Sequence, residues 1–365
     1  MIEQRDVWQM KGDWKVRTYF PFMREEWIES LANLLKTQSI SDFSIREEFE
    51  RKLANYCNCK YALAVNSGTS AIIMGMKALG LGKYSLVVGP NYGNIAWVNC
   101  CRFLNILPYS IDVRKDNFCL DESRLDQLLS NGDVHGVLYI NHAGYTGPQL
   151  DEVVSICNKY RVPLLEDSCN ALGQWFNNKH AGTRGDIGFI SFGVPKLLTC
   201  GEGGAILLNN ERLYHKCKDL MYHGGWYDPP VHTRLNIGGN FVMPMQNAYF
   251  LSKQLDDIAL LLAMRKRVCD YYESKGIKLK RFHQAPSIYE YETNKPIEII
   301  EKAKHFKVQI LRHNYIAHGR LLNLDQERMP NSEYIQDHTV LLPNTLNLSE
   351  KEIDLICASI KLGEM

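Results

Sequence analysis

A lysine in an apolar, glycine-rich segment has the setting best suited to chemistry. Lys196 lies between the hydrophobic run that ends at Ser191-Phe192 and the turn Gly201-Glu-Gly-Gly204, and the acidic pair Glu166-Asp167 precedes it. A lysine amine is ordinarily protonated near neutral pH, so nucleophilic use requires a pocket that holds and partly desolvates it. The flanking apolar residues and glycines can supply that pocket. Taken alone, a lysine is more often a solvated surface charge. The residues expected near Lys196 must therefore distinguish a catalytic lysine from a surface one.

A second segment is suited to binding an anion. Gly68, Thr69 and Ser70 follow an apolar run and open a helical pattern, so backbone N–H groups and two hydroxyls can converge on a phosphate at a helix N-terminus. An ordinary capped helix start explains the same residues, because such starts are common. Ser191 also ends a predicted strand and could donate to the same phosphate, which strengthens the first interpretation.

Asp167 directly follows the apolar strand 163–166, at the sheet edge where α/β folds place ligands. In enzymes that use pyridoxal phosphate, an aspartate keeps the ring nitrogen protonated and a lysine holds the aldehyde as a Schiff base. Asp167 and Lys196 have those two types in that order. A strand-end aspartate also often caps the next helix, and spacing alone does not separate the two interpretations.

Alternating strand and helix patterns must position these residues. The predicted strands are 61–65, 86–89, 106–113, 134–140, 163–166, 187–192 and 205–208, and the clearest predicted helices are 69–79, 149–160 and 211–221. This alternation indicates an α/β fold with a mostly parallel sheet between helices.

The pattern changes twice along the chain. We predict a large domain over 1–245 with an N-terminal arm that wraps it, partly helical over 20–36, then a connecting helix over 246–276. The remaining segment, 277–365, is predicted to form a smaller α+β domain that ends in a helix over 349–362.

Composition limits the function classes. The chain has 365 residues and a formal net charge of +1, so no overall field draws it to nucleic acid or anionic lipid, and small polar substrates are the expected partners. The absence of a signal-like or membrane-spanning apolar run predicts a cytoplasmic protein. The eleven cysteines lack metal-site and redox-motif spacing, so we expect reduced, mostly buried thiols and no metal.

The chain resembles the pyridoxal-phosphate-dependent sugar aminotransferases of the DegT/StrS type. The matching segments are Phe49-Glu50, Asn66-Ser-Gly-Thr69, Glu166-Asp-Ser-Cys-Asn-Ala-Leu-Gly173, Ala181-Gly-Thr-Arg-Gly-Asp-Ile-Gly188, Ser191-Phe192, Lys196, Gly201-Glu-Gly-Gly204, Tyr222-His-Gly224, Gly239-Asn240 with Met243, and Leu341-Leu-Pro343. Their order and spacing cover most of the chain. The resemblance implies the fold-type I architecture of aspartate aminotransferase, with a seven-stranded sheet.

The resemblance also implies roles for individual residues. Lys196 would form the Schiff base with pyridoxal 5'-phosphate and then move the proton, and Asp167 would bind the ring nitrogen. The phosphate would be held by Gly68, Thr69, Ser70 and Ser191. Asn170 would lie near the ring hydroxyl. Asn240 matches an asparagine that reaches the phosphate of the other subunit, which implies a homodimer with shared active sites.

The implied reaction is the transfer of an amino group. Related dehydratases carry histidine in place of Lys196, so lysine favours transamination. Glutamate or glutamine would give its amino group to the cofactor, and pyridoxamine 5'-phosphate would pass it to a keto sugar, usually nucleotide-linked, in amino-sugar biosynthesis. The alternatives are a sugar dehydratase, an aminotransferase for a cyclitol or small phosphorylated ketone, and a non-catalytic regulatory relative.

Several positions depart from the family pattern and bear on substrate recognition. Gly93-Asn94 stands where an aromatic ring usually stacks on the cofactor, so Tyr92 or Trp97 could supply that ring, although both also fit a core. Gly193 and Val242 replace common substrate-side residues, which hints at an unusual acceptor.

Histidines and a basic segment complete the candidate substrate residues. His142 and His223 match positions where the family often has histidine, and either could touch the substrate or satisfy a buried hydrogen bond. The region 287–341 looks shorter than in the family. Its basic residues could meet substrate anions, but a solvated basic face is the alternative: Arg312, His313, His318 and Arg320.

Overall fold

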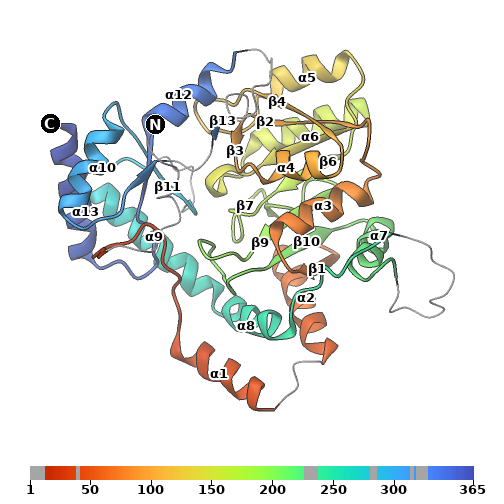
Figure 1. Cartoon of the computed structure of the whole chain (residues 1–365), viewed down its shortest axis with the longest axis horizontal. Coiled ribbons are helices and arrows are strands. Elements are labelled where there is room, and N and C mark those ends of the chain that lie inside the picture. Colours follow the sequence, from red (N-terminus) through yellow and green to blue (C-terminus); the bar gives the residue numbers. More distant parts are fainter. Residues whose placement is uncertain (1–12, 38–41, 226–236, 280–285, 313–315, 318–327) are drawn as a thin grey trace.

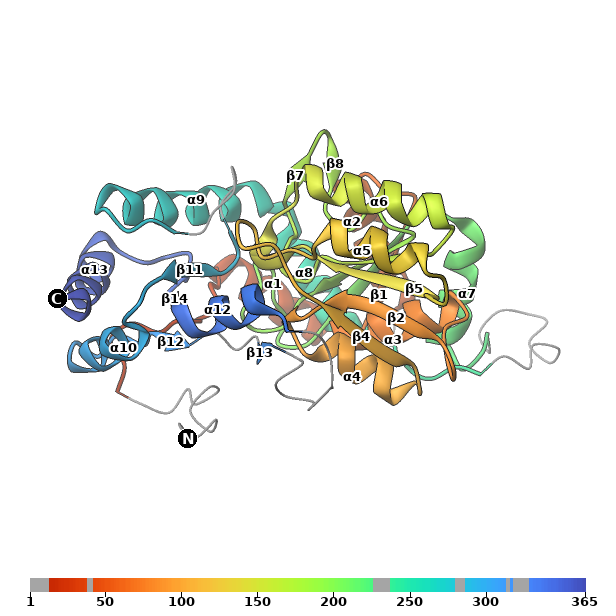
Figure 2. The same ribbon diagram turned by 90° about the horizontal axis from the view of Figure 1, so that it is seen from above.

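The computed structural model describes residues 13–37, 42–225, 237–279, 286–312, 316–317 and 328–365. A larger body holds the main sheet, and a smaller body at the C-terminal end is joined to it by two consecutive helices (Figure 1). The longer of these helices extends between the two bodies (Figure 2).

The seven predicted strands all pair in one sheet, in the order β1-β10-β9-β6-β5-β2-β4. Their bounds are β1 Tyr61–Val65, β2 Leu86–Pro90, β4 Leu107–Ile111, β5 Gly136–Ile140, β6 Leu164–Asp167, β9 Ile187–Ser191 and β10 Gly204–Leu208. Within this sheet β10 is antiparallel to both of its neighbours, and the remaining pairs are parallel. The predicted mostly parallel sheet is therefore confirmed.

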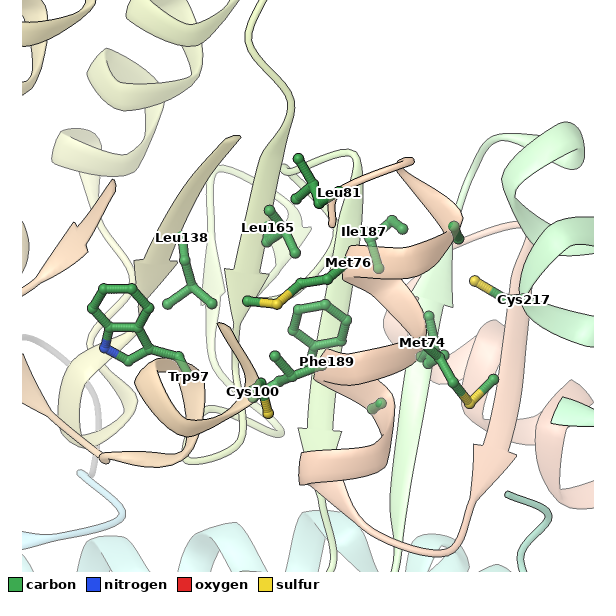
Figure 3. Packing of buried hydrophobic residues seen from close by; sticks show 14 of the residues in the cluster. Met74, Met76, Leu81, Trp97, Cys100, Leu138, Leu165, Ile187, Phe189 and Cys217 are labelled. Carbon is green, nitrogen blue, oxygen red and sulfur yellow. The ribbon is translucent and has the colours of Figure 1, made fainter. Parts of the chain in front are cut away.

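Helices cover both faces of this sheet (Figure 2). Their bounds are α2 Phe43–Cys57, α3 Gly68–Ala78, α4 Ala96–Phe103, α5 Glu122–Ser130, α6 Pro148–Tyr160 and α7 Glu211–Met221. The predicted helices correspond to α3, α6 and α7. In the core between the sheet and α3 and α4, Phe189 packs near Met76, and Trp97 lies beside Leu138 (Figure 3).

The smaller body has the predicted α+β composition. A three-stranded sheet in the order β11-β14-β12 is accompanied by helices α10, α12 and α13. The bounds are β11 Tyr289–Glu292, β12 Leu311–Arg312, β14 Thr339–Leu342, α10 Pro296–His305, α12 Pro330–His338 and α13 Glu350–Glu364. Minor elements elsewhere are β3 Tyr92–Gly93 paired with β13 Ile316–Ala317, β7 Trp175–Phe176 paired with β8 Lys179–His180, and the 3₁₀ helix η2 His142–Gly144.

The prediction of one connecting helix over 246–276 is wrong in its continuity. Two helices, α8 (Met245–Asp256) and α9 (Ile258–Ser274), meet at Asp257. The Asp257 carboxylate accepts hydrogen bonds from Arg24 Nη1 at 2.8 Å and Trp27 Nε1 at 2.7 Å. Asp257 therefore anchors α1 (Glu25–Lys36) at the break, which the sequence pattern does not reveal.

The N-terminal arm does not simply wrap the large domain as predicted. Val16 pairs with Val308 in an isolated bridge and is buried in the core of the small body. Thr18 Oγ1 donates to Gln309 O at 2.5 Å. The arm therefore joins the small body before α1 packs against α8. The domain boundaries at 245 and 276 stay a prediction.

All eleven cysteines are free thiols, eight of them buried, as predicted. Among the residues that the structure describes, no helix is both long and apolar enough to cross a membrane. The same residues hold no cluster of histidine, cysteine and acidic side chains suited to a metal ion.

Candidate functional site

Two neighbouring parallel strands place polar residues at one edge of the sheet. β6 ends at Asp167 and β9 ends at Ser191, and the two strands pair in parallel. Asp167 is only 6% exposed, and its Oδ1 accepts a hydrogen bond from Cys169 N at 3.0 Å. A carboxylate is thereby fixed below the carboxyl edge of the sheet, where parallel α/β folds bind ligands.

Lys196 and Asn170 meet beside this aspartate. Lys196 Nζ donates to Asn170 Oδ1 at 2.5 Å. Burial lowers the pKa of the Lys196 amine, and the nearby Asp167 charge partly opposes this effect. Burial likewise raises the pKa of Asp167, and Lys196 opposes that rise. The two side chains therefore lie close enough for each charge to affect the protonation of the other.

The start of α3 combines a cap with free donors. Ser67 Oγ accepts from Ser70 N at 3.0 Å and lies 2.9 Å from Ser70 Oγ, so the capped-helix interpretation is correct for this pair. The first-turn N–H groups of Gly68 and Thr69 have no intrahelical acceptor. A Cβ at Gly68 would lie 3.1 Å from Ser191 Cβ, so glycine is what lets α3 approach the end of β9.

Glu166, which precedes Asp167 on β6, stabilises the structure around the site. It is fully buried, and its carboxylate accepts from Asn141 Nδ2 at 2.8 Å and from Gly182 N at 2.6 Å. The other oxygen accepts from Arg184 N at 2.8 Å and Gly185 N at 3.0 Å. Four donors satisfy this carboxylate, so Glu166 holds the 182–185 loop in place rather than facing a ligand.

Tyr92 and His142 lie together in a buried cluster. The Tyr92 ring is 5.4 Å from the His142 ring and 6.0 Å from the Phe118 ring. His142 Nε2 is 2.8 Å from Glu290 Oε1 on β11 of the small body. These contacts give both residues a place in the packing between the two bodies, and their predicted substrate role stays a prediction.

The other aromatic candidate is also in the core. Trp97 is fully buried, and a Cβ at Gly89 would lie 2.8 Å from its Cη2 atom. Asn94 is exposed, and its Oδ1 accepts from Ala96 N at 2.9 Å at the start of α4. The ring of Trp97 is therefore engaged in packing against the sheet, while Asn94 shapes the entry to α4.

Asn240 and His223 lie on a separate, exposed edge. Tyr222 and Asn240 form an antiparallel bridge, and His223 N donates to Gly239 O at 2.9 Å. Both Asn240 and His223 are exposed in the single chain. Contact with another subunit is compatible with that position and stays a prediction.

The structure describes one of the four basic candidates in the small body. Arg312 Nη2 donates to Gln336 O at 3.2 Å and to Asp337 O at 3.4 Å, which holds it against α12. His313, His318 and Arg320 lie outside the described residues.

Sequence reasoning missed one charged residue near the lysine. Arg265 on α9 is 3% exposed, and its charge contributes to lowering the Lys196 pKa after the larger effect of burial. Leu261, Val268 and Tyr272 share its buried face at helical spacing. A charged residue within such an apolar stripe is a signal that could have identified it.

These residues fit pyridoxal phosphate. The start of α3 and Ser191 offer donors of the kind that bind a phosphate, the buried Asp167 suits a protonated ring nitrogen, and Lys196 suits an aldehyde. The close approach at Gly68 forms the cradle, which a side chain there would fill.

Comparisons with known proteins agree with this geometry. The family model described as the DegT/DnrJ/EryC1/StrS aminotransferase family matches residues 21–361. A GDP-perosamine synthase of Caulobacter vibrioides is 30% identical over 233 residues, covering 64% of this chain and 62% of the relative. A GDP-perosamine synthase of Escherichia coli O157:H7 is 24% identical over 352 residues, covering 92% and 91%.

The chain thus spans about three fifths of the first of these relatives and nearly all of the second. Among solved structures, NtdA from Bacillus subtilis with bound cofactor PMP has a TM-score of 0.82 at 22% identity, covering 94% of this chain and 83% of that one. This likeness shows that the two chains share a fold.

Proposed function

This chain belongs to the DegT/DnrJ/EryC1/StrS aminotransferase family, and from that premise we propose that it is a pyridoxal-phosphate-dependent aminotransferase. It moves an amino group from glutamate or glutamine to a keto sugar. The observation that carries this proposal is the buried Lys196, which donates to Asn170 and whose pKa is affected by the charge of Asp167, near the N-terminus of α3 at Gly68.

Each of these residues has a proposed role in binding the cofactor or in catalysis. Lys196 holds the cofactor and later moves a proton, for which its lowered pKa leaves more of the amine unprotonated near neutral pH. Asp167 would hold the ring nitrogen, and Asn170 would hold the ring hydroxyl. The N–H groups of Gly68 and Thr69, together with Ser191, bind the phosphate.

When bound, pyridoxal phosphate supplies an electron-accepting ring, and its pyridoxamine form carries the amino group between the two half-reactions. Lys196 favours this exchange over elimination, because a lysine beside the reacting carbon can deliver and remove the same proton. The dehydratase alternative is therefore the second candidate.

The proposed acceptor is a nucleotide-linked keto sugar. The two relatives described above are named GDP-perosamine synthases, and that name supports a nucleotide sugar for this chain. We also propose a homodimer, with the exposed edge at Asn240 facing the partner's cofactor.

The proposal is tested by the cofactor itself. Purified protein supplied with pyridoxal phosphate should be yellow, borohydride should trap the cofactor, and peptide mapping should place the adduct on Lys196. A folded K196A variant should lack the adduct. Wild-type protein that stays colourless with added cofactor would end the enzymatic interpretation.

Product mass separates the candidate reactions. Wild-type protein is incubated with glutamate and a panel of nucleotide-linked keto sugars, cyclitol ketones and small phosphorylated ketones. Transamination replaces the ketone oxygen by an amino group, whereas dehydration removes a water molecule. Loss of water without amine gain would favour the dehydratase.

A further inference from the structure

A buried arginine near Lys196 has no described partner for its charge. Arg265 lies on α9 and is 3% exposed. Its Nε has no hydrogen-bond partner, and no carboxylate among the described residues forms an ion pair with it. Burial lowers the pKa of the guanidinium, which reflects the cost of holding it away from water. A buried cation is strongly unfavourable unless an anion compensates it.

The helix that carries this arginine packs on the segment that contains Asn170. A Cβ at Gly173 would lie 2.9 Å from Leu262 Cδ2, so α9 rests on the segment that begins at Asn170. Arg265 follows Leu262 by three residues and thus shares that side of the helix. Tyr289 Oη donates to Arg265 O at 3.0 Å, which fixes this part of α9 against the small body.

Ser287 is a second buried polar residue without a described side-chain partner, and it lies near the segment that contains Asn170. Ser287 is 4% exposed, and its Oγ has no hydrogen-bond partner among the described residues. Its backbone is fixed, because Ser287 N donates to Ala143 O at 2.7 Å and Asn344 Nδ2 donates to Ser287 O at 2.6 Å. A Cβ at Gly144 would lie 2.9 Å from Asn170 O and 3.4 Å from Ser287 N.

The position of Arg265 indicates which anion would compensate its charge. The cofactor phosphate has its own donors at the start of α3. The phosphates of a nucleotide sugar are several bonds from its reacting carbon. A carboxylate on the carbon that bears the amine is one bond away, and a guanidinium binds such a group through two parallel hydrogen bonds.

We propose that Arg265, assisted by the Ser287 hydroxyl, binds the α-carboxylate of the amino donor and thereby selects an α-amino acid. This proposal rests on the proposed function. It assigns donor selection to α9 and to the segment before β11. Figure 2 shows where α9 and β11 lie in the chain fold.

The test compares L-glutamate with L-isoglutamine, in which an amide replaces the α-carboxylate. Binding is measured by calorimetry on protein whose cofactor has been fixed to Lys196 by borohydride, so no turnover occurs. Wild-type protein should prefer glutamate by on the order of 100-fold, since an unpaired buried charge is costly. R265Q should reduce this preference below about fivefold, and S287A should reduce it partly.

The control is K266Q, which removes an exposed charge from the same helix and should keep the full preference. A folded R265Q protein with the wild-type preference would overturn the proposal. If R265Q does not fold, wild-type protein decides, because equal binding of glutamate and isoglutamine would also overturn it. Failure to trap cofactor on Lys196 would instead reject the proposed function.

Discussion

At the scale of the residue, Asp167 and Lys196 each alter the protonation of the other. The Asp167 charge stabilises the Lys196 ammonium, so it raises a pKa that burial lowers. In cofactor-free protein, D167N removes that charge, and the Lys196 pKa should fall further. Acetylation of Lys196, followed against pH by peptide mass spectrometry, should therefore show a midpoint at lower pH in D167N than in the wild type.

The exposed Asp133 offers a matched control, because D133N removes one negative charge away from the site. It should leave the Lys196 midpoint unchanged. A midpoint in D167N equal to or above that of the wild type would mean that the two groups do not share a space, and the proposed cofactor site would lose its basis.

Glu50 is a residue whose titration affects folding. Its Oε1 accepts from Ala64 N at 2.8 Å, and burial raises its pKa to about 7. The folded state therefore binds more protons than the unfolded state between the ordinary glutamate pKa of 4.5 and about 7, and stability falls as pH rises through that window. E50Q keeps the acceptor without the titrating group, so the stability of E50Q should fall less than that of the wild type between pH 5 and pH 8, by about 1–3 kcal/mol.

Chemical denaturation at pH 5 and pH 8 measures this difference. E48Q is a suitable control, because Glu48 is exposed on the same helix. Its stability should follow that of the wild type at both values. If the stabilities of E50Q and wild type changed equally between pH 5 and pH 8, Glu50 would not have the raised pKa of a buried carboxyl group.

At the scale of the element, one carboxylate connects β6 to the 182–185 loop. Glu166 accepts four hydrogen bonds, and three of them come from the backbone N–H groups of Gly182, Arg184 and Gly185. E166Q preserves size but turns an NH₂ group toward two N–H donors. The variant should lose about 2–4 kcal/mol of stability, and the loop should exchange its amide hydrogens faster.

The exposed Glu202 supplies the comparison, since E202Q should change neither stability nor exchange over 182–185. Unchanged protection of the loop in a folded E166Q protein would show that other contacts hold it.

The sequence predicted the strands better than the helices. Each strand of the main sheet is a short, mostly apolar run. Every predicted strand is therefore present, although some observed ends differ from the predicted ends by a few residues. α2 was missed because its buried residues, among them Phe49 and Leu53, are separated by charged ones. The break at Asp257 was missed because its cause is a contact with α1.

The same distinction applies to the candidate site. Lys196, Asp167 and Ser191 were predicted as site residues because each ends or follows β6 or β9, and these two strands pair in parallel. The local pattern therefore places all three near one edge of the sheet. Arg265 was missed because its place beside Lys196 depends on how α9 packs across the loop at Gly173. Tyr92 was recognised as a candidate, but its cluster with His142 and Phe118 arises from contacts distant in sequence.

At the scale of the whole molecule, contacts between the two bodies hold the residues of the proposed donor site. His142 meets Glu290, Ser287 N bonds to Ala143 O, and Tyr289 bonds to Arg265 O. The small body therefore carries β11 and Ser287 to the sheet edge of the large one. Any change that loosens the small body should weaken donor binding more than cofactor binding.

The N-terminal arm provides a way to loosen it from a distance. Val16 is buried in the small-body core, and Gln309 N donates to Val16 O at 2.9 Å. V16A removes two buried carbons and should cost about 1–3 kcal/mol, with faster amide exchange over 308–312. Affinity for glutamate should fall while borohydride trapping on Lys196 stays complete.

F20A separates this effect from a general loss of apolar surface. Phe20 lies on the same arm but is 52% exposed, so its removal should leave exchange over 308–312 and glutamate affinity unchanged. If V16A destabilised the protein and trapping and glutamate affinity fell together, the two bodies would unfold as one unit. The small body would then have no separate influence on the donor site, because its core would depend on the same cooperative transition that holds the cofactor.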